Sequence, residues 1–203
     1  MTSVAATVGD AVVLVSEVDV SEAHLRSTRL ASALPRQGTS EGRQLRRWLT
    51  QVLVTSRVVS AEAQALGLTV DGAPTEDELL PDVAARLEIG SVAAAALEGA
   101  VARALFVHVT AHVEISADQV ADYHRRNPFR FAPRTTGDGG WLGGPVATSF
   151  DDVRADIAEH LLAAGRRREF RRWLDERRAQ LVSLAPGYEH PGDPRQPDNT
   201  HEH

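Results

Sequence analysis

The chain has 203 residues, of which 42% are hydrophobic and 25% are charged, and its formal net charge is −6. This negative charge argues against general nucleic-acid binding, because proteins that bind phosphate backbones present basic surfaces. The chain has no cysteine, which excludes disulfides, thiolate metal ligands and a cysteine nucleophile. All 22 basic side chains other than histidine are arginines, so Schiff-base chemistry and a P-loop lysine are excluded as well.

The length and the hydropathy pattern predict one globular domain with short appendages. No apolar run approaches the roughly 18 residues that a membrane span needs. The first three residues lack the basic segment and apolar stretch of a signal peptide. We therefore expect a cytoplasmic protein without a membrane partner, whose oligomeric state the sequence does not indicate.

The first third of the chain predicts a hairpin followed by two helices. Apolar, β-branched runs at residues 4–8 and 12–15 flank Gly9-Asp10, a strong turn signal. Residues 21–34 predict a helix that Pro35 ends. Residues 40–66 carry apolar side chains at helical spacing and precede Gly67, which is typical of a helix C-cap.

The rest of the chain predicts four more helices and a coil. Residues 75–87 form the first, and residues 91–113 form a second that is apolar almost all round and is expected in the middle of the structure. Ser116 caps a third, which ends at Asn127-Pro128. Residues 149–184 predict a last long helix, and the proline-rich residues 185–203 predict a coil. The last helix has an apolar seam of Val153, Ile157, Leu161, Phe170, Trp173, Leu174 and Leu181.

Two segments resemble a known family of folding factors. Residues 4–10 read Val-Ala-Ala-Thr-Val-Gly-Asp, and residues 115–128 read Ile-Ser-Ala-Asp-Gln-Val-Ala-Asp-Tyr-His-Arg-Arg-Asn-Pro. They resemble the opening of the chaperone domain and the helix before the catalytic domain in the SurA/PpiC family of parvulin-type peptidyl-prolyl isomerases. The resemblance implies a mostly helical chaperone-like domain over residues 1–132, which the helix at 149–184 completes by packing back.

The catalytic domain of that family is missing. Residues 133–148 form only a glycine-rich bridge, and Gly137–Gly144 resembles a remnant of the parvulin Gly-Gly-x-Leu-Gly loop. A parvulin domain needs on the order of 90 residues to fold. We therefore expect no prolyl isomerase activity, and we interpret the bridge as a linker, since it lacks the strand and the lysine of a phosphate-binding loop.

Histidines are the strongest candidates for chemistry. His190, His201 and His203 lie in the tail beside several carboxylates, a donor set that suits zinc, copper, nickel, iron or manganese. A proline-rich C-terminus is more often a solvated coil. His108 and His112 are four residues apart, which places both on one helix face at a spacing used by metal ligands. The alternative is two core histidines bonded to backbone or carboxylate groups.

A second set of residues is a candidate for partner binding. Tyr123 and His124 stand where the family has a Tyr-Tyr pair. Eight arginines and five acids lie between residues 154 and 178, and Arg167 and Arg171 belong to this cluster. The arginines form either a solvated helix face or a docking surface for an acidic protein.

Two functions follow from these observations. The first is a cytoplasmic chaperone-like accessory protein that binds or matures a partner polypeptide. The alternative is a metal-dependent enzyme or metal-binding protein on a similar scaffold, because fold does not determine function.

Overall fold

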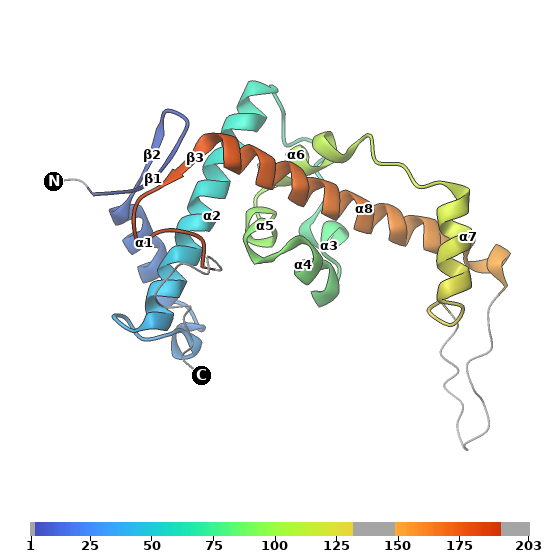
Figure 1. The fold of residues 1–203 in the computed structure, drawn as a ribbon, viewed down its shortest axis with the longest axis horizontal. Coiled ribbons are helices and arrows are strands. Elements are labelled where there is room, and N and C mark those ends of the chain that lie inside the picture. The colour runs from blue at the N-terminus through green and yellow to red at the C-terminus, as the bar shows by residue number, and fades with distance from the viewer. Residues whose placement is uncertain (1–2, 132–148, 192–203) are drawn as a thin grey trace, which may run out of the picture.

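The computed structural model of the chain describes residues 3–131 and 149–191, and these are mostly helical, with one small antiparallel sheet (Figure 1). The predicted glycine-rich bridge, and the tail with His201 and His203, lie outside the described residues. The strands are β1 (Val4–Val8), β2 (Ala11–Leu14) and β3 (Val182–Leu184). The helices are α1 (Val15–Arg26), α2 (Ser40–Ala65), α3 (Glu76–Leu79), α4 (Val83–Ile89), α5 (Ser91–Ala96), α6 (Ala100–Thr110), α7 (Ala117–Arg126) and α8 (Phe150–Leu181).

The sheet joins the two ends of the chain. The predicted hairpin is present, and Gly9 adopts φ +54° at its turn, a conformation that glycine adopts without steric cost. The strand order is β2-β1-β3, and Ala6 of β1 pairs with Leu184 of β3. The sequence predicted helix as far as residue 184, but the helix ends at Leu181. The following Val182-Ser183-Leu184 alternates half-buried and exposed side chains, as an edge strand does.

Local capping signals account for the long helices. Thr39 accepts a 3.1 Å hydrogen bond from the Gly42 amide at the start of α2, and Gly67 with φ +63° follows its end. The first helix differs from its prediction, since it begins at Val15 and ends at Arg26. There Glu17 accepts a 2.8 Å hydrogen bond from the Leu14 amide, so a carboxylate in the first turn takes over the capping role.

Two predicted helices are each broken into two. The helix expected at 75–87 is interrupted between α3 and α4, because Pro81 lacks an amide hydrogen and disfavours helical torsions at Leu80. The helix expected at 91–113 is interrupted at residues 97–99, where Gly99 precedes α6. The break turns the side chain of Leu97 into the core, where it is fully buried.

The apolar core has a main cluster and two smaller ones. One of the smaller clusters contains Ala5, Val18 and Leu49 of the hairpin, α1 and α2, and the other lies near the start of α8. The main cluster lies among the sheet, α2, α4 to α6 and the second half of α8, where the Phe106 and Phe170 rings are 5.1 Å apart. The cluster near the start of α8 joins α7 to the first half of this helix through Val120, Val153 and Ile157. Helix α8 has 32 residues, with a rise of about 1.5 Å per residue. It runs from the cluster beside α7 to the main cluster, and in Figure 1 it forms the top of an arch.

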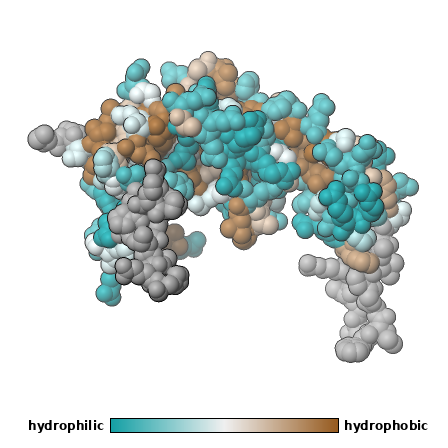
Figure 2. Space-filling view, in the orientation of Figure 1, coloured by the Kyte–Doolittle hydropathy of each residue, from teal (hydrophilic) through white to brown (hydrophobic). Residues whose placement is uncertain are grey.

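Large apolar side chains are exposed on α6 and on α4. Helix α6 contributes Leu105 and Phe106 to the main cluster, but Val101 and Val107 are exposed, so the helix is not buried on all sides as its almost wholly apolar sequence predicted. Helix α4 exposes Val83 and Leu87 at 70% and 75%, and an apolar patch projects over this helix at the lower edge of the arch (Figure 2). Within residues 3–131 and 149–191, no helix is long and apolar enough to cross a membrane.

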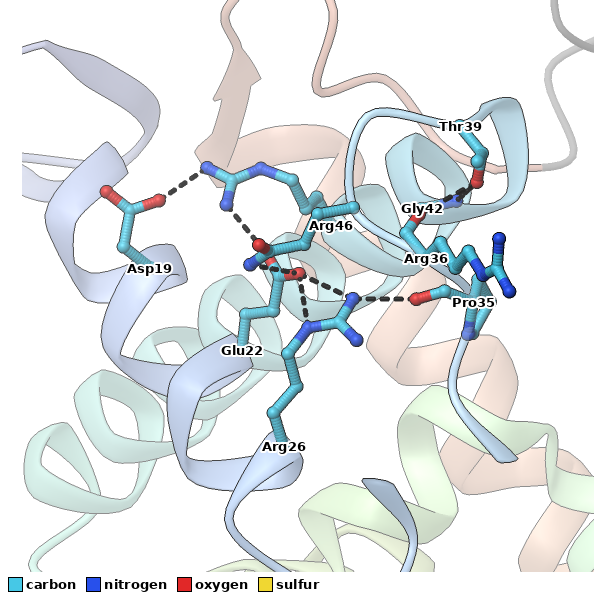
Figure 3. Close-up of polar contacts among 9 residues, drawn as sticks. Asp19, Glu22, Arg26, Pro35, Arg36, Thr39, Gly42 and Arg46 are labelled. Carbon is cyan, nitrogen blue, oxygen red and sulfur yellow. Dashed lines mark hydrogen bonds and ion pairs between the residues drawn. The ribbon is translucent and has the colours of Figure 1, made fainter. Parts of the chain in front are cut away.

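A buried carboxylate fastens α1 to α2 (Figure 3). Glu22 is 2% exposed and accepts hydrogen bonds from Arg26 at 2.9 Å, Arg46 at 2.8 Å and Gln37 at 3.1 Å. Burial by itself would raise the pKa of Glu22, but these donors outweigh it and hold the pKa below its ordinary value of 4.5. Arg26 also donates to the Pro35 carbonyl at 2.7 Å, so one carboxylate organises the loop between the two helices.

Candidate functional site

Helix α7 is held in place by its own ends and by α8. Ser116 accepts a 3.2 Å hydrogen bond from the Gln119 amide, and the Gln119 side chain accepts one of 2.8 Å from the Ser116 amide. This capping box confirms the predicted start of the helix. At the other end the Asn127 side chain donates a 3.0 Å hydrogen bond to the Tyr123 carbonyl, and Pro128 prevents continuation. Tyr123 is therefore presented to α8 from a short helix with both ends defined.

An aromatic cluster forms where Tyr123 meets α8. The Tyr123 hydroxyl lies 3.3 Å from Nε2 of His160, and the two rings are 5.6 Å apart. Phe131 completes the cluster, with its ring 6.3 Å from Tyr123 and 5.8 Å from His160. Burial, followed by the nearby charges of Arg130 and Arg167, lowers the pKa of His160 below 6.5. The unprotonated nitrogen of a neutral imidazole can accept a hydrogen bond from the tyrosine hydroxyl.

A pocket of about 320 Å³ opens beside this cluster, between α7 and α8. Its apolar wall comes from Ile115, Tyr123 and Leu161, and Arg126 and Arg168 stand among the polar groups of its lining. A pocket of this size, with a mixed lining, falls at the small end of the range for ligand sites in proteins. We call it the α7–α8 pocket.

His124, the other predicted contact residue on α7, faces a different neighbour. Its ring lies 5.4 Å from that of Phe150, near the start of α8. The two residues that stand for the Tyr-Tyr pair thus both contact α8, one through His160 and one through Phe150.

The predicted docking arginines hold parts of this chain together. Arg167 is 6% exposed and donates a 2.7 Å hydrogen bond to Glu88 of α4. Arg168 pairs with the same carboxylate at 2.9 Å, and Arg171 donates to the Glu88 carbonyl at 3.3 Å. Glu88 is therefore the centre of an arginine cluster that fixes α4 against α8. Arg168 also lines the α7–α8 pocket, so this cluster connects the pocket with α4.

The predicted histidine pair lies on the surface, with His108 in α6 and His112 in the turn after it, because the helix ends at Thr110 and not near residue 113. His108 and His112 are both exposed, so neither occupies the core. His112 lies 3.4 Å from Glu169 of α8, whose pKa is lowered mainly by its hydrogen bonds with Arg172. His108 lines a shallow hollow of about 480 Å³ together with Trp173 and Glu176.

Among the residues that the structure describes, the predicted metal ligands His108, His112 and His190 are not grouped with further ligands into a set that could hold a metal ion. His190 is exposed and lines a hollow of about 220 Å³ with Arg171 and Arg178. In the part of the chain that the structure describes, no three or more histidine, aspartate or glutamate side chains are grouped so that they could hold a metal ion. His201 and His203 lie outside that part.

Sequence reasoning missed His160 and Glu88. His160 follows Ile157 by three residues and precedes Ala164 by four, so helical spacing alone places it on the buried stripe of α8. Glu88 carries no comparable signal, because its arginine partners lie about eighty residues away in the chain.

Comparison with known proteins identifies one short similarity. A family model described as a family of unknown function (DUF7158) matches residues 4–41, which include the hairpin, α1 and the loop organised by Glu22. No curated protein and no solved structure matches the chain.

Proposed function

We propose that the protein is a chaperone-like accessory protein of the cytoplasm, without prolyl isomerase activity, that binds an apolar segment of a partner polypeptide. The observation that carries this proposal is the exposed pair Val83 and Leu87 on α4. They are four residues apart, so they present one continuous apolar face of the helix. They belong to the apolar patch over α4 in Figure 2, and contiguous exposed apolar patches are typical of surfaces that another molecule covers.

The surroundings of this pair support a role in binding. Glu88 follows Leu87 directly and is fixed by Arg167 and Arg168, so α4 is held rigidly against α8. Arg168 binds Glu88 of α4 and also lines the α7–α8 pocket. This pocket supplies a second apolar contact at Tyr123 and Leu161. An extended segment with two separated apolar side chains would match this arrangement. A rigid receiving surface loses little entropy on binding.

The resemblance to the SurA/PpiC family supports the same proposal. In the sequence it covers residues 4–131 and 149–182, where the chain folds back through α8 and β3 onto its N-terminal hairpin. Arg167 and Arg171 already bind Glu88 within this chain. The proposed partner is therefore recognised mainly through apolar contacts and not through these two arginines. An acidic partner remains a prediction that rests on the other exposed arginines.

Suppression of client aggregation tests the proposal. The wild-type protein should slow the aggregation of an unfolded model polypeptide in a dose-dependent way, and V83S/L87S should lose most of this effect. Val20→Ser is the matched control, because Val20 is 69% exposed and belongs to α1, not to α4. No suppression by the wild type, or an equal loss in V20S, would contradict the proposal. A peptide isomerisation assay on the same protein should give the uncatalysed rate.

The alternative, a metal-dependent function, depends on His190, His201 and His203. Elemental analysis of dialysed protein tests it directly. Metal near one equivalent in the wild type, lost in the variant with all three histidines changed to alanine, would favour this function over the accessory role.

A further inference from the structure

A cavity of about 470 Å³ lies on a different side of α8 from the α7–α8 pocket. Glu159, Leu162, Ala163 and Arg166 line it from α8, and their spacing of three, four and seven residues places them on one helix face. Phe106 and Val107 of α6 and Leu79 of α3 form the opposite apolar walls. The volume is that of a site for a small organic molecule.

The rim of this cavity is fixed by Arg103. Its guanidinium donates to the carbonyl of Pro74 at 2.6 Å, which anchors the loop before α3. It also donates to the carbonyls of Leu97 at 3.0 Å and Glu98 at 2.6 Å. One guanidinium thus binds three carbonyls, which fixes the positions of the loop, the end of α5 and α6 relative to one another. The cavity is therefore preformed.

Arg166 is the unusual member of the lining. Its Nε is buried and has no hydrogen-bond partner, and no ion pair of its guanidinium is found within residues 3–131 and 149–191. Its neighbour Arg167 is bonded to Glu88, and Arg172 is bonded to Glu169. A buried N–H without a partner is costly, and the cost is larger when the group is charged. The terminal nitrogens of Arg166 form no ion pair within the described residues, and an anion placed in the cavity would pair with them.

The nearby carboxylates limit the charge of that anion. Glu78 lines the cavity, but its carboxylate accepts hydrogen bonds from the Thr75 amide at 2.6 Å and the Thr75 hydroxyl at 2.9 Å. Glu159 is exposed at the rim. Arg167 also lines the cavity but is paired with Glu88, and the two carboxylates disfavour a doubly charged phosphate more than a singly charged anion.

We propose that this cavity binds a monocarboxylate attached to an apolar group, with Arg166 as the carboxylate partner and Phe106, Val107 and Leu162 around the apolar part. Arginine pairs with carboxylates in a two-pronged geometry that its two terminal nitrogens can provide together. Such a carboxylate could come from a free fatty-acid-like molecule or from the C-terminus of an apolar polypeptide. The site does not depend on the proposed function, since it shares no lining residue with the α7–α8 pocket.

Calorimetric titration of the full chain with paired probes tests this site. Decanoate and an N-acetylated apolar pentapeptide with a free C-terminus are the carboxylate probes, and decanol and the C-terminal amide are their uncharged counterparts. We expect at least one carboxylate probe to bind about tenfold or more tightly than its counterpart, as a charge-assisted hydrogen bond predicts. Binding of decanoate alone would identify a free amphiphile as the source, and binding of the peptide alone would identify a chain terminus.

Variants on α8 connect the binding to Arg166. Arg166→Met keeps the length and apolar stem of the side chain, and it should reduce carboxylate binding to the level of the uncharged probe. Arg154→Met, an exposed arginine on the same helix, should bind as the wild type does. The melting temperature of R166M should not fall, since the change removes an unpartnered buried N–H.

The proposal is overturned if neither carboxylate probe binds, if decanol binds as tightly as decanoate, or if R166M retains wild-type affinity. Chemical-shift changes in the wild-type protein provide a measurement that needs no variant. They should centre on Phe106, Val107 and Leu162, and changes centred on α7 would contradict the assignment.

Discussion

Arg46 of α2 donates a 2.8 Å hydrogen bond to Glu22 of α1, and this contact joins the two helices through residues that are 24 positions apart in the sequence. Glu22 is buried, so its carboxylate is largely shielded from solvent. The carboxylate also accepts hydrogen bonds from Arg26 and Gln37. A buried carboxylate with several donors stabilises a fold mainly because removing it leaves charges unpaired. The N-terminal part of the structure therefore depends on one side chain that a surface view would not reveal.

We predict that Glu22→Gln lowers the free energy of unfolding by about 2–3 kcal/mol, because both arginines lose their counter-charge in a site shielded from water. Asp19→Asn is the control. Asp19 also bonds to Arg46, at 2.7 Å, but its side chain is 57% exposed, so solvent screening should limit its effect to about 0.5 kcal/mol or less. Urea unfolding followed by circular dichroism measures both. Equal losses in the two variants would mean that burial of Glu22 is not what matters.

The same carboxylate predicts how stability responds to acid. The pKa of Glu22 is lower in the folded chain than its ordinary value of 4.5, so the unfolded chain binds more protons once the pH falls below that value. Stability from this group is fully present above pH 4.5 and is lost as the pH falls through the folded pKa. The difference in unfolding free energy between wild type and E22Q should therefore narrow below pH 4.5. A constant difference down to pH 3 would show that the charge of Glu22 is not involved.

Signals close together in the sequence predicted much of this fold, whereas contacts between distant segments were not predictable. Gly9, Thr39 and Ser116 each act within a few residues, and the hairpin and the starts of α2 and α7 follow from them. Pro81 carries a similar signal, yet residues 75–87 were predicted as one helix. The network around Glu22 depends on how α2 packs, and the pairing of β3 with β1 joins residues that are far apart in the chain.

The candidate sites divide in the same way. Tyr123 was identified from its place in a motif, and it does contact α8. Arg166 could not be separated from its arginine neighbours by sequence, because only the packed structure distinguishes a guanidinium with a partner from one without.

His160 predicts a second response to pH, between the helices α7 and α8. Its pKa lies below 6.5 in the folded chain because burial and nearby arginines disfavour the charged ring. The unfolded chain therefore binds more protons below about pH 6.5, and the contact with Tyr123 should weaken as the pH falls through this region. Hydrogen exchange at α7 amides, corrected for intrinsic rates, should accelerate from pH 7.5 to 5.5 relative to amides of α2.

Two variants serve as checks on this response. His160→Phe keeps a ring but cannot be protonated, so it should remove the pH dependence of exchange at α7. His112→Gln changes an exposed histidine beside Glu169 and should leave that dependence as in the wild type. If H160F retained the acceleration, another group would have to be responsible.

The ion pair between Arg167 and Glu88 predicts a measurable coupling energy. Arg167 has a side chain only 8% exposed, and its Nε lies 2.7 Å from Glu88. A double-mutant cycle with Arg167→Met and Glu88→Gln should give about 1–2 kcal/mol, since desolvated pairs are screened less than surface pairs. The exposed pair of Arg172 and Glu176, at 2.6 Å, should give no measurable coupling in the same experiment. The comparison distinguishes a desolvated ion pair that fixes α4 from an exposed ion pair that does not contribute to stability.

Gly42 predicts a destabilisation that helix propensity alone would not. A Cβ at this position would lie 2.3 Å from the Arg36 carbonyl oxygen, a contact with backbone that no rotamer change relieves. Alanine normally stabilises a helix relative to glycine by about 1 kcal/mol. We expect Gly42→Ala to destabilise the protein by about 2 kcal/mol nevertheless, because the loop before α2 must move and Arg26 would lose its place at Pro35. Gly99→Ala is the matched control, since its Cβ would make an ordinary 3.5 Å contact with the Ala96 carbonyl. Thermal unfolding of both variants decides the question, and a G42A protein as stable as G99A would show that the loop shifts without cost.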